Sequence, residues 1–381
     1  MKKLFSSTIF KLIIAVIIGI LLGFVANEGF MNFVVTVKYI LGQLIFFMVP
    51  LIILGFVSYS IAKMKDNASK MLSLALIIAY LSSIGAAFFA MVSGYTLIPH
   101  LSIEPVKETL RQLPELIFRL DIPPVVSVMT ALVLAIMIGL ATVWTKSEVF
   151  ENLLDNFQKM VLLLINRILI PILPFFIAAN FCALSYEGAI TKQLPVFLGV
   201  MVIVIISQFV WLSFLYVLAG AISKKNPWQV LKSSAATLAV ALKCAKKSPV
   251  LKDDVIDFAV PLFSNIHLCG SILTEVFFVM TVSLMLYGSL PSLTVMILFI
   301  ILLGIFAIGA PGVPGGTVIA SLGIVISVLG FDEAGTALLL TIFALQDSFG
   351  TACNITGDGA LTLIMTKASS HRSTKQKSIN S

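Results

Sequence analysis

Long runs of apolar residues, separated by short polar stretches, follow one another along nearly the whole chain. Eight of these runs are long enough for a helix that crosses the hydrocarbon core of a bilayer, which takes about 20 residues. They lie at 8–26, 37–62, 71–98, 124–145, 157–185, 195–222, 255–286 and 334–366. The runs are continuous and lack the alternation of barrel strands. The pattern therefore predicts an all-α integral membrane protein with eight transmembrane helices.

Two further apolar segments do not have the pattern of plain spans. The segment 227–248 is broken by "KSSAATLA", and the segment 293–330 is broken by "GAPGVPGGT". Proline removes a backbone donor and glycine is costly within a helix, so the second break cannot be helical. Non-helical backbone at membrane depth is tolerated where protein buries it or where it lines a wet cavity. We therefore expect two re-entrant helical hairpins whose tips lie at such a cavity.

The positions of Lys and Arg predict the topology. With eight crossings and two hairpins, the basic clusters before span one and after spans two, four, six and eight all fall on one side. Counting either hairpin as a full crossing would invert everything that follows it. Because cytoplasmic loops are enriched in Lys and Arg, both termini are expected in the cytoplasm. The first apolar run has no clear cleavage site, so we interpret it as an uncleaved span of a multi-pass protein in the cell membrane.

Composition supports the membrane assignment and excludes several other classes. Hydrophobic residues make up 59% of the chain, charged residues 11%, and the mean hydropathy is +1.08. Soluble domains have about 25% charged residues. The net charge of +7 is explained by topology, so no nucleic-acid partner is indicated. The four cysteines are isolated and have no CxxC spacing, which indicates neither a disulfide framework nor a zinc site. No organic cofactor is expected.

The stretch "QDSFGTACNITGDGAL", residues 346–361, places a polar stripe inside the last apolar run. On a helix, Asp347, Thr351, Asn354 and Asp358 fall at i, i+4, i+7 and i+11 and line one face. Carboxylates at the bilayer centre cost about 2.5 to 3.5 kcal/mol each, and no Lys or Arg occurs between Lys252 and Lys367. A cationic ligand, a metal ion or a proton must therefore neutralise them. The alternative is a structural seam in which the acids are protonated or hydrogen-bonded.

Four motifs resemble those of the dicarboxylate/amino acid:cation symporter family, which includes glutamate transporters and bacterial serine/threonine transporters. They are "KSSAATLA", "NIHLCGS", "GAPGVPGG" and "DSFGTACNITGD". The resemblance covers nearly the whole chain and implies a glutamate-transporter-like fold and a homotrimer. It also implies a scaffold within 1–222 on which spans three and six contact the core, a transport core at 223–367, and a basic cytoplasmic tail at 368–381.

The resemblance assigns roles to residues at matching positions. Asp347 would bind the α-ammonium group of an amino acid, and Thr351 and Asn354 would hold its α-carboxylate region. Asp358 would ligate a sodium ion together with Asn354 and backbone carbonyls of span seven, since oxygen ligands suit hard cations. The hairpin tips would contact the substrate through Ser233, Ser234, Val313 and Gly315.

Gly350 is the first departure from the family pattern. Members that carry acidic substrates have an arginine there, three residues after the aspartate, to pair with the side-chain carboxylate. Without that partner a buried carboxylate is poorly held. This favours a small neutral amino acid such as serine, threonine or alanine. An acidic amino acid or a dicarboxylate is the alternative, because Lys232 could reach the site.

The second departure lies in "NIHLCGS", where His267 and Cys269 replace an asparagine and an aspartate that help to bind sodium. Imidazole and thiol are poor ligands for a hard cation, so one sodium site is expected to be lost, although His267 and Ser271 stay candidate cation-binding residues. The hydroxyls of Ser82 or Ser83 could belong to the same site. Glu275 lies eight residues after His267, about two helical turns, and the pair could relay a proton. Sodium is thus the expected coupling ion and a proton the alternative, while a plain core histidine stays open.

Two other classes of function fit less well. An intramembrane hydrolase would need two carboxylates about 3 Å apart, whereas three helical turns separate Asp347 from Asp358 by about 16 Å. Cys269 and His267 would point away from each other on a helix. A passive channel would need a repeated filter or a ring of charges. The sequence therefore predicts a secondary active transporter that works by alternating access, and no enzyme.

Overall fold

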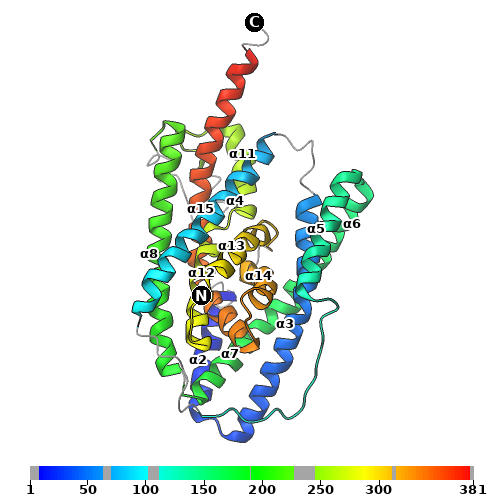
Figure 1. Ribbon diagram of the computed structural model, residues 1–381, viewed down its shortest axis with the longest axis vertical. Coiled ribbons are helices and arrows are strands. Elements are labelled where there is room, and N and C mark those ends of the chain that lie inside the picture. The colour runs from blue at the N-terminus through cyan, green and yellow to red at the C-terminus, as the bar shows by residue number, and fades with distance from the viewer. Residues whose placement is uncertain are drawn as a thin grey trace.

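The computed structural model of the chain describes residues 8–62, 70–101, 111–188, 190–226, 245–310 and 315–377. Every regular element within these ranges is a helix, and the helices form one elongated bundle (Figure 1). Six helical stretches in the described part are long and apolar enough to cross a membrane. This confirms the all-α membrane class, whereas the expected numbers of spans and hairpins stay predictions.

Six predicted spans correspond to one helix each. These helices are α2 (Thr8–Val25), α3 (Glu28–Ala62), α4 (Lys70–Leu97), α5 (Val128–Thr145), α8 (Ile190–Ser223) and α15 (Glu333–Lys377). A short 3₁₀ turn, η1 (Ile98–His100), follows α4. Helix α15 continues well past the predicted end of its span, and its C-terminal part projects beyond the bundle (Figure 1).

Each of the two remaining predicted spans is formed by more than one helical element. The run at 157–185 is formed by α6 (Glu148–Leu164), a π-helical turn η2 (Ile165–Leu169) and α7 (Ile170–Tyr186). Pro171 follows this turn, in keeping with the association of π-bulges and proline with helix bending. The run at 255–286 is formed by α11 (Asp253–Ile266) and α12 (Cys269–Tyr287). The expectation of a continuous helix was therefore wrong for the latter span.

The second broken segment forms two helices in contact with each other, α13 (Leu293–Ile308) and α14 (Gly316–Ser327). Gly315 precedes α14 in the left-handed conformation, with φ of 72°, which glycine adopts without strain. Residues 311–314, including Val313, lie outside the described residues. So do residues 227–244 of the first broken segment, with Ser233 and Ser234.

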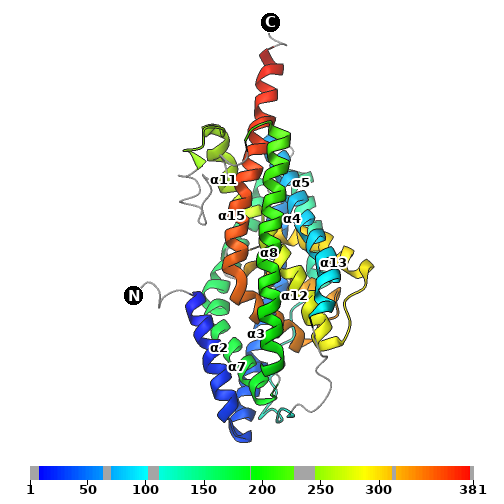
Figure 2. The ribbon, with the colours of Figure 1, turned by 90° about the vertical axis from the view of Figure 1, so that its left-hand side faces the viewer.

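Helix α12 is the centre of the bundle. Its residues from Cys269 to Val282 are all buried, and α4, α8 and α15 surround it (Figure 2). Other extensive contacts join α2 to α7, α3 to α5 and α6, and α8 to α15. Because α12 is buried on all sides, each polar side chain that it carries needs a hydrogen-bonding partner within the protein.

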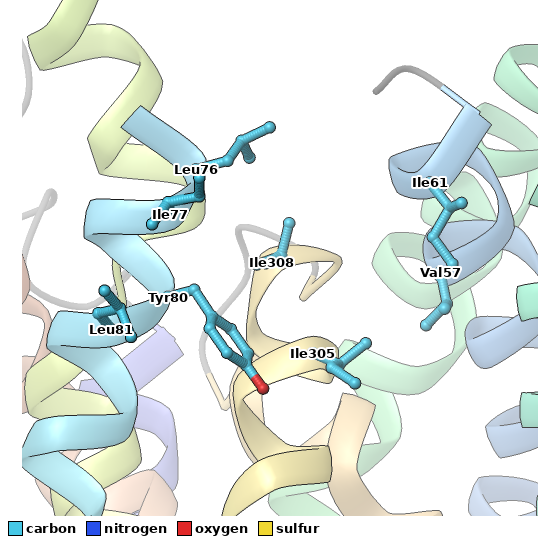
Figure 3. A pocket seen from close by; sticks show the side chains of 8 residues that line it. All are labelled: Val57, Ile61, Leu76, Ile77, Tyr80, Leu81, Ile305 and Ile308. Atoms are coloured by element: carbon cyan, nitrogen blue, oxygen red, sulfur yellow. The ribbon is translucent and has the colours of Figure 1, made fainter. Parts of the chain in front are cut away.

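An apolar cavity of about 390 Å³ lies between α3, α4 and α13 (Figure 3). Seven aliphatic side chains and Tyr80 line it. The Tyr80 hydroxyl, its one polar side-chain group, donates a hydrogen bond to the carbonyl of Ile301 at 3.3 Å. The cavity therefore offers no set of polar groups for a charged substrate.

Close packing of α2 on α7 provides a test of this arrangement. A Cβ atom added to Gly19 would lie 2.4 Å from the carbonyl oxygen of Ala178, so the two backbones would have to separate. We expect Gly19→Ala to lower the free energy of unfolding by about 1–3 kcal/mol, visible as a lower Tm of the purified protein in detergent. The matched control is Gly29→Ala, whose new methyl group has its nearest neighbour at 3.8 Å. Equal Tm values for the two variants would contradict the packing.

Candidate functional site

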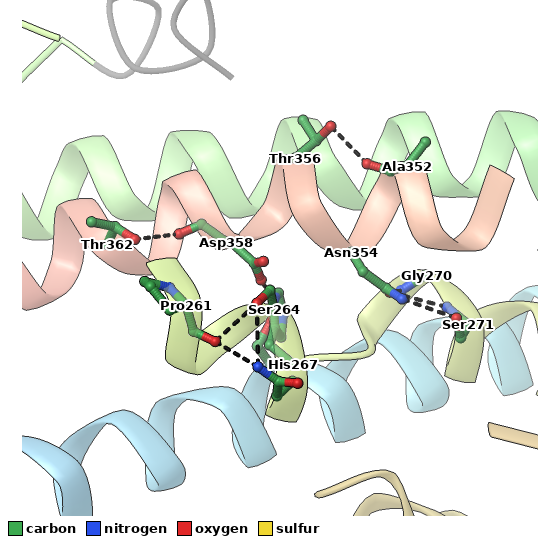
Figure 4. Close-up of polar contacts among 12 residues, drawn as sticks. Pro261, Ser264, His267, Gly270, Ser271, Ala352, Asn354, Thr356, Asp358 and Thr362 are labelled. Atoms are coloured by element: carbon green, nitrogen blue, oxygen red, sulfur yellow. Dashed lines mark hydrogen bonds and ion pairs between the residues drawn. The ribbon is translucent and has the colours of Figure 1, made fainter. Parts of the chain in front are cut away.

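The site begins where span seven breaks. Helix α11 ends at Ile266, His267 is extended with φ of −108° and ψ of 98°, and α12 starts at Cys269. The C-terminal end of α11 and the N-terminal end of α12 therefore meet inside the bundle, between α15 and α4 (Figure 4). Helix ends leave backbone carbonyls and N–H groups without intrahelical partners, so this break supplies both acceptors and donors.

Asn354 of α15 caps the N-terminal end of α12. Its Oδ1 atom accepts hydrogen bonds from the backbone N–H groups of Gly270 at 2.7 Å and Ser271 at 3.2 Å (Figure 4). Its Nδ2 atom donates to Ser271 Oγ at 2.9 Å. The residue before α12, Leu268, has no side-chain acceptor, so Asn354 supplies the cap from another helix. Asn354 and Ser271, two predicted cation-binding residues, are thus bonded to each other.

Glycines allow α12 and α15 to approach closely at this point. A Cβ atom on Gly270 would lie 2.5 Å from Cys353 Cβ and 2.6 Å from the carbonyl oxygen of Gly350. A Cβ atom on Gly350 would lie 3.2 Å from Ser271 Oγ. The Asn354 cap depends on this short separation of the two helices.

His267 joins three parts of the site. Its Nδ1 atom lies 2.9 Å from Asp358 Oδ1 on α15, and its Nε2 atom lies 2.9 Å from Ser82 Oγ on α4. All three side chains are buried, with His267 at 0% and Asp358 at 1% exposure. The structure thereby brings His267 and Asp358 together and selects Ser82, rather than Ser83, as the serine that bonds to the histidine.

The second carboxylate oxygen of Asp358 points to a ligand. Oδ2 is buried and has no hydrogen-bond partner among the described residues. The last carbonyls of α11 are also near the break, and helix C-terminal carbonyls beside a carboxylate form the kind of donor set that holds sodium in transporters. The residues present therefore fit one hard cation at Asp358 Oδ2. The Asn354 carbonyl oxygen fits less well, because two N–H groups already occupy it.

The second predicted carboxylate, Asp347, lies further along α15. It is half-buried and faces the backbone N–H of Gly315, the residue that precedes α14. Gly315, the last residue before α14, is thus adjacent to Asp347. Gly350 is buried, whereas Thr351, the predicted neighbour of the substrate, has an exposed side chain. All four residues of the predicted stripe, from Asp347 to Asp358, lie on the single helix α15.

Glu275 belongs to a different contact. Ser321 of α14 donates a hydrogen bond to Glu275 Oε1, while Oε2 is buried without a partner among the described residues. The expectation that two turns of one helix separate His267 from Glu275 was wrong, because α12 starts only at Cys269. Their proton relay stays a prediction.

The argument against a catalytic pair of Cys269 and His267 also assumed a continuous helix. His267 and Cys269 both lie against Gly357, where an added Cβ would be 2.9 Å from His267 Cε1 and 3.3 Å from Cys269 Sγ. The expectation that they point away from each other was therefore wrong. Both ring nitrogens of His267 are nevertheless hydrogen-bonded to Asp358 and Ser82, so the imidazole is not placed to activate the thiol.

Helix α8 contributes residues that the sequence did not single out. Gln208 donates to Thr274 Oγ1 on α12 at 3.0 Å, and the Tyr216 hydroxyl donates to the carbonyl of Thr356 on α15 at 2.8 Å. Gln208 is a lone amide in an apolar span, and such residues often bond across helices in membranes. The sequence could therefore have singled out Gln208. Ser321 could not have been found in this way, because a single serine in an apolar helix is not distinctive.

A helix broken inside the bundle, a buried carboxylate at the break and a second carboxylate beside Gly315 are features typical of membrane transporters. Residues 8–368 match the sodium:dicarboxylate symporter family, and the chain belongs to this family. This confirms the predicted resemblance. The family is one of secondary transporters and not of enzymes, and its name implies sodium as the coupling ion.

Among curated proteins, the chain is similar to excitatory amino acid transporter 3 from several mammals. It is 28% identical to the Bos taurus protein over 62% of this chain and 47% of that protein. For the Mus musculus protein the identity is 26%, over 58% and 44% of the two chains. For the Homo sapiens protein it is 31%, over 37% and 26%. The chain therefore spans about half the length or less of these relatives.

The Asn354 cap can be tested without a transport assay. We expect Asn354→Ala to lower the free energy of unfolding by about 1–3 kcal/mol, because two buried N–H groups lose their acceptor. The measurement is the Tm of the purified protein in detergent. The matched control is Asn265→Ala, at an exposed asparagine of α11, which should change the Tm by much less. A Tm for Asn354→Ala no lower than that of the control would refute the capping role.

Proposed function

We propose that the protein is a secondary active transporter that carries a small neutral amino acid, such as serine, threonine or alanine, together with a cation by alternating access. Membership of the symporter family supports the transport of a small anion-bearing molecule with sodium. The observation that carries the choice of substrate is the pair Asp347 and Gly350, a carboxylate followed one helical turn later by a glycine, with no Lys or Arg anywhere from residue 253 to residue 366. The family also implies the cell membrane as location and a homotrimer as assembly.

Asp347 is suited to bind the substrate's α-ammonium group. It is half-buried, and no Lys or Arg occurs between Lys252 and Lys367 to compete for it. The α-carboxylate would lie towards Thr351 and the amide of Asn354, which retains one Nδ2 hydrogen after bonding to Ser271. The start of α14 at Gly315 adds a partial positive charge nearby, as helix N-termini do.

Gly350 favours a neutral side chain on the substrate. Its neighbour is Ser271, at 3.2 Å from an added Cβ, so the wall at this point consists of a hydroxyl and backbone. A substrate side-chain carboxylate buried there would have no charge partner, which is costly. The alternative is an acidic amino acid or a dicarboxylate. It is favoured by the family name and by Lys232, a residue outside the described ranges.

Charge neutralisation provides the coupling. Asp358 Oδ2 and the end of α11 would hold the cation, which supplies a positive charge to the buried carboxylate. A core that moves with two bare carboxylates would place both in a low-dielectric environment, at about 2.5–3.5 kcal/mol each. Movement is therefore favoured when both are neutralised. We infer that the helices α11 to α15 form the transport core, that α4 and α8 of the scaffold part pack on it, and that it moves against α2, α3 and α5 to α7.

The substrate class is tested by uptake into proteoliposomes. Labelled serine, threonine, alanine, glutamate and aspartate are compared under a sodium gradient and then under a proton gradient. We expect the neutral amino acids to be taken up at least about tenfold faster than the acidic ones, because losing the partner of a buried charge costs more than 1.4 kcal/mol. Uptake of glutamate without serine would show that the argument from Gly350 is wrong.

The role of Asp347 is tested in the same vesicles. Asp347→Asn keeps the shape of the side chain but removes the charge that faces the ammonium group. We expect amino-acid uptake at low substrate concentration to fall by about 30-fold or more, since truncating a buried charge pair costs about 2–5 kcal/mol. Glu148→Gln, at an exposed acid of α6, serves as control and should transport normally. Undiminished uptake by Asp347→Asn would exclude the assigned role.

A further inference from the structure

Three groups that attract a positive charge converge on the side chain of His267. They are the carboxylate of Asp358, the hydroxyl of Ser82 and the C-terminal end of α11, which carries a partial negative charge. A carboxylate, a hydroxyl and helix carbonyls are oxygen donors of the kind that hold hard cations. The imidazole ring already occupies the space between the first two.

The ring is held without room for an additional ion on its own side. Both nitrogens are hydrogen-bonded at 2.9 Å, and the side chain is fully buried. The ring meets Phe263 edge-on with centroids 6.4 Å apart, and it packs so closely on Gly357 that a Cβ there would lie 2.9 Å from Cε1. Imidazole nitrogen is a poor ligand for a hard cation, so the ring fills the position instead of coordinating an ion.

We propose that His267 is a positioning residue that takes the place of a mobile cation at the break in span seven. It donates from Nδ1 to Asp358 Oδ1 and forms a hydrogen bond with Ser82 through Nε2. A side chain of the protein itself, in place of a dissociable ion, therefore links α15 to α4 at the break. Only Asp358 Oδ2 is then left for an ion. The proposal rests on the proposed cation-coupled function, because it concerns the same carboxylate, and it explains how the break stays assembled when no ion is bound.

The test is the sodium dependence of protein stability. The purified full-length protein, His267→Asn and the control His100→Asn, at an exposed histidine, are melted in NaCl and in KCl of equal ionic strength. In His267→Asn, both oxygens of Asp358 and the Ser82 hydroxyl become free, and sodium can enter the vacated space. We expect a lower Tm than wild type in KCl and a rise in NaCl that exceeds the wild-type rise by at least about 2 °C. His100→Asn should behave as the wild type does.

Equal sodium-dependent rises in all three proteins, or an equal loss of Tm for His267→Asn in both salts, would overturn the proposal. If His267→Asn is not obtained as a monodisperse protein, His267→Ser provides the test, since it also vacates the space of the ring and leaves both Asp358 and the Ser82 hydroxyl in place. Its sodium-dependent rise should exceed that of wild type, and an unchanged rise would count against the proposal. These measurements need no transport. A failure of amino-acid uptake together with the expected sodium response would therefore reject the proposed function and leave the assignment of His267 standing.

Discussion

The burial of the Asp358 carboxylate determines how the rest of the site is built. The chain offers no Lys or Arg between Lys252 and Lys367, and a carboxylate without a partner is costly away from water. The neighbouring helix therefore has to present polar groups to it. A continuous helix in span seven would present only side chains, whereas the break before α12 exposes backbone groups and lets the ring of His267 reach Asp358 Oδ1.

The break is itself stabilised from α15. Asn354 satisfies two N–H groups at the start of α12, and the glycines at 270 and 350 let the two helices come close enough for this contact. Helix α15 thus carries both Asn354, which caps the start of α12, and Asp358, which bonds to His267 at the break. Asn354 lies between Asp347 and Asp358 on α15 and is bonded to Gly270 and Ser271 of α12, so it would connect the proposed substrate and ion positions.

Much of this could be predicted from the sequence, because it depends on patterns within single helices. The stripe from Asp347 to Asp358 follows from helical periodicity, and the second broken segment follows from its prolines and glycines. The break at His267 could not be predicted in this way. Ile266, His267 and Leu268 include neither proline nor glycine, and the group that replaces the lost helical bonds is Asn354, 84 residues from Gly270 in the chain. The bond from Ser321 to Glu275 likewise joins residues 46 positions apart.

Helix α15 is unbroken from Glu333 to Lys377, whereas the neighbouring span seven is divided into α11 and α12 at His267. A straight helix advances 1.5 Å per residue and resists stretching, so the spacing between Asp347 and Asp358 is fixed at about 16 Å. Any adjustment to a longer or shorter cargo must therefore come from groups that face α15 rather than from α15 itself, and Gly315 before α14 is one group that faces Asp347. A change of cargo preference is then expected to alter such facing residues and to leave the spacing along α15 unchanged.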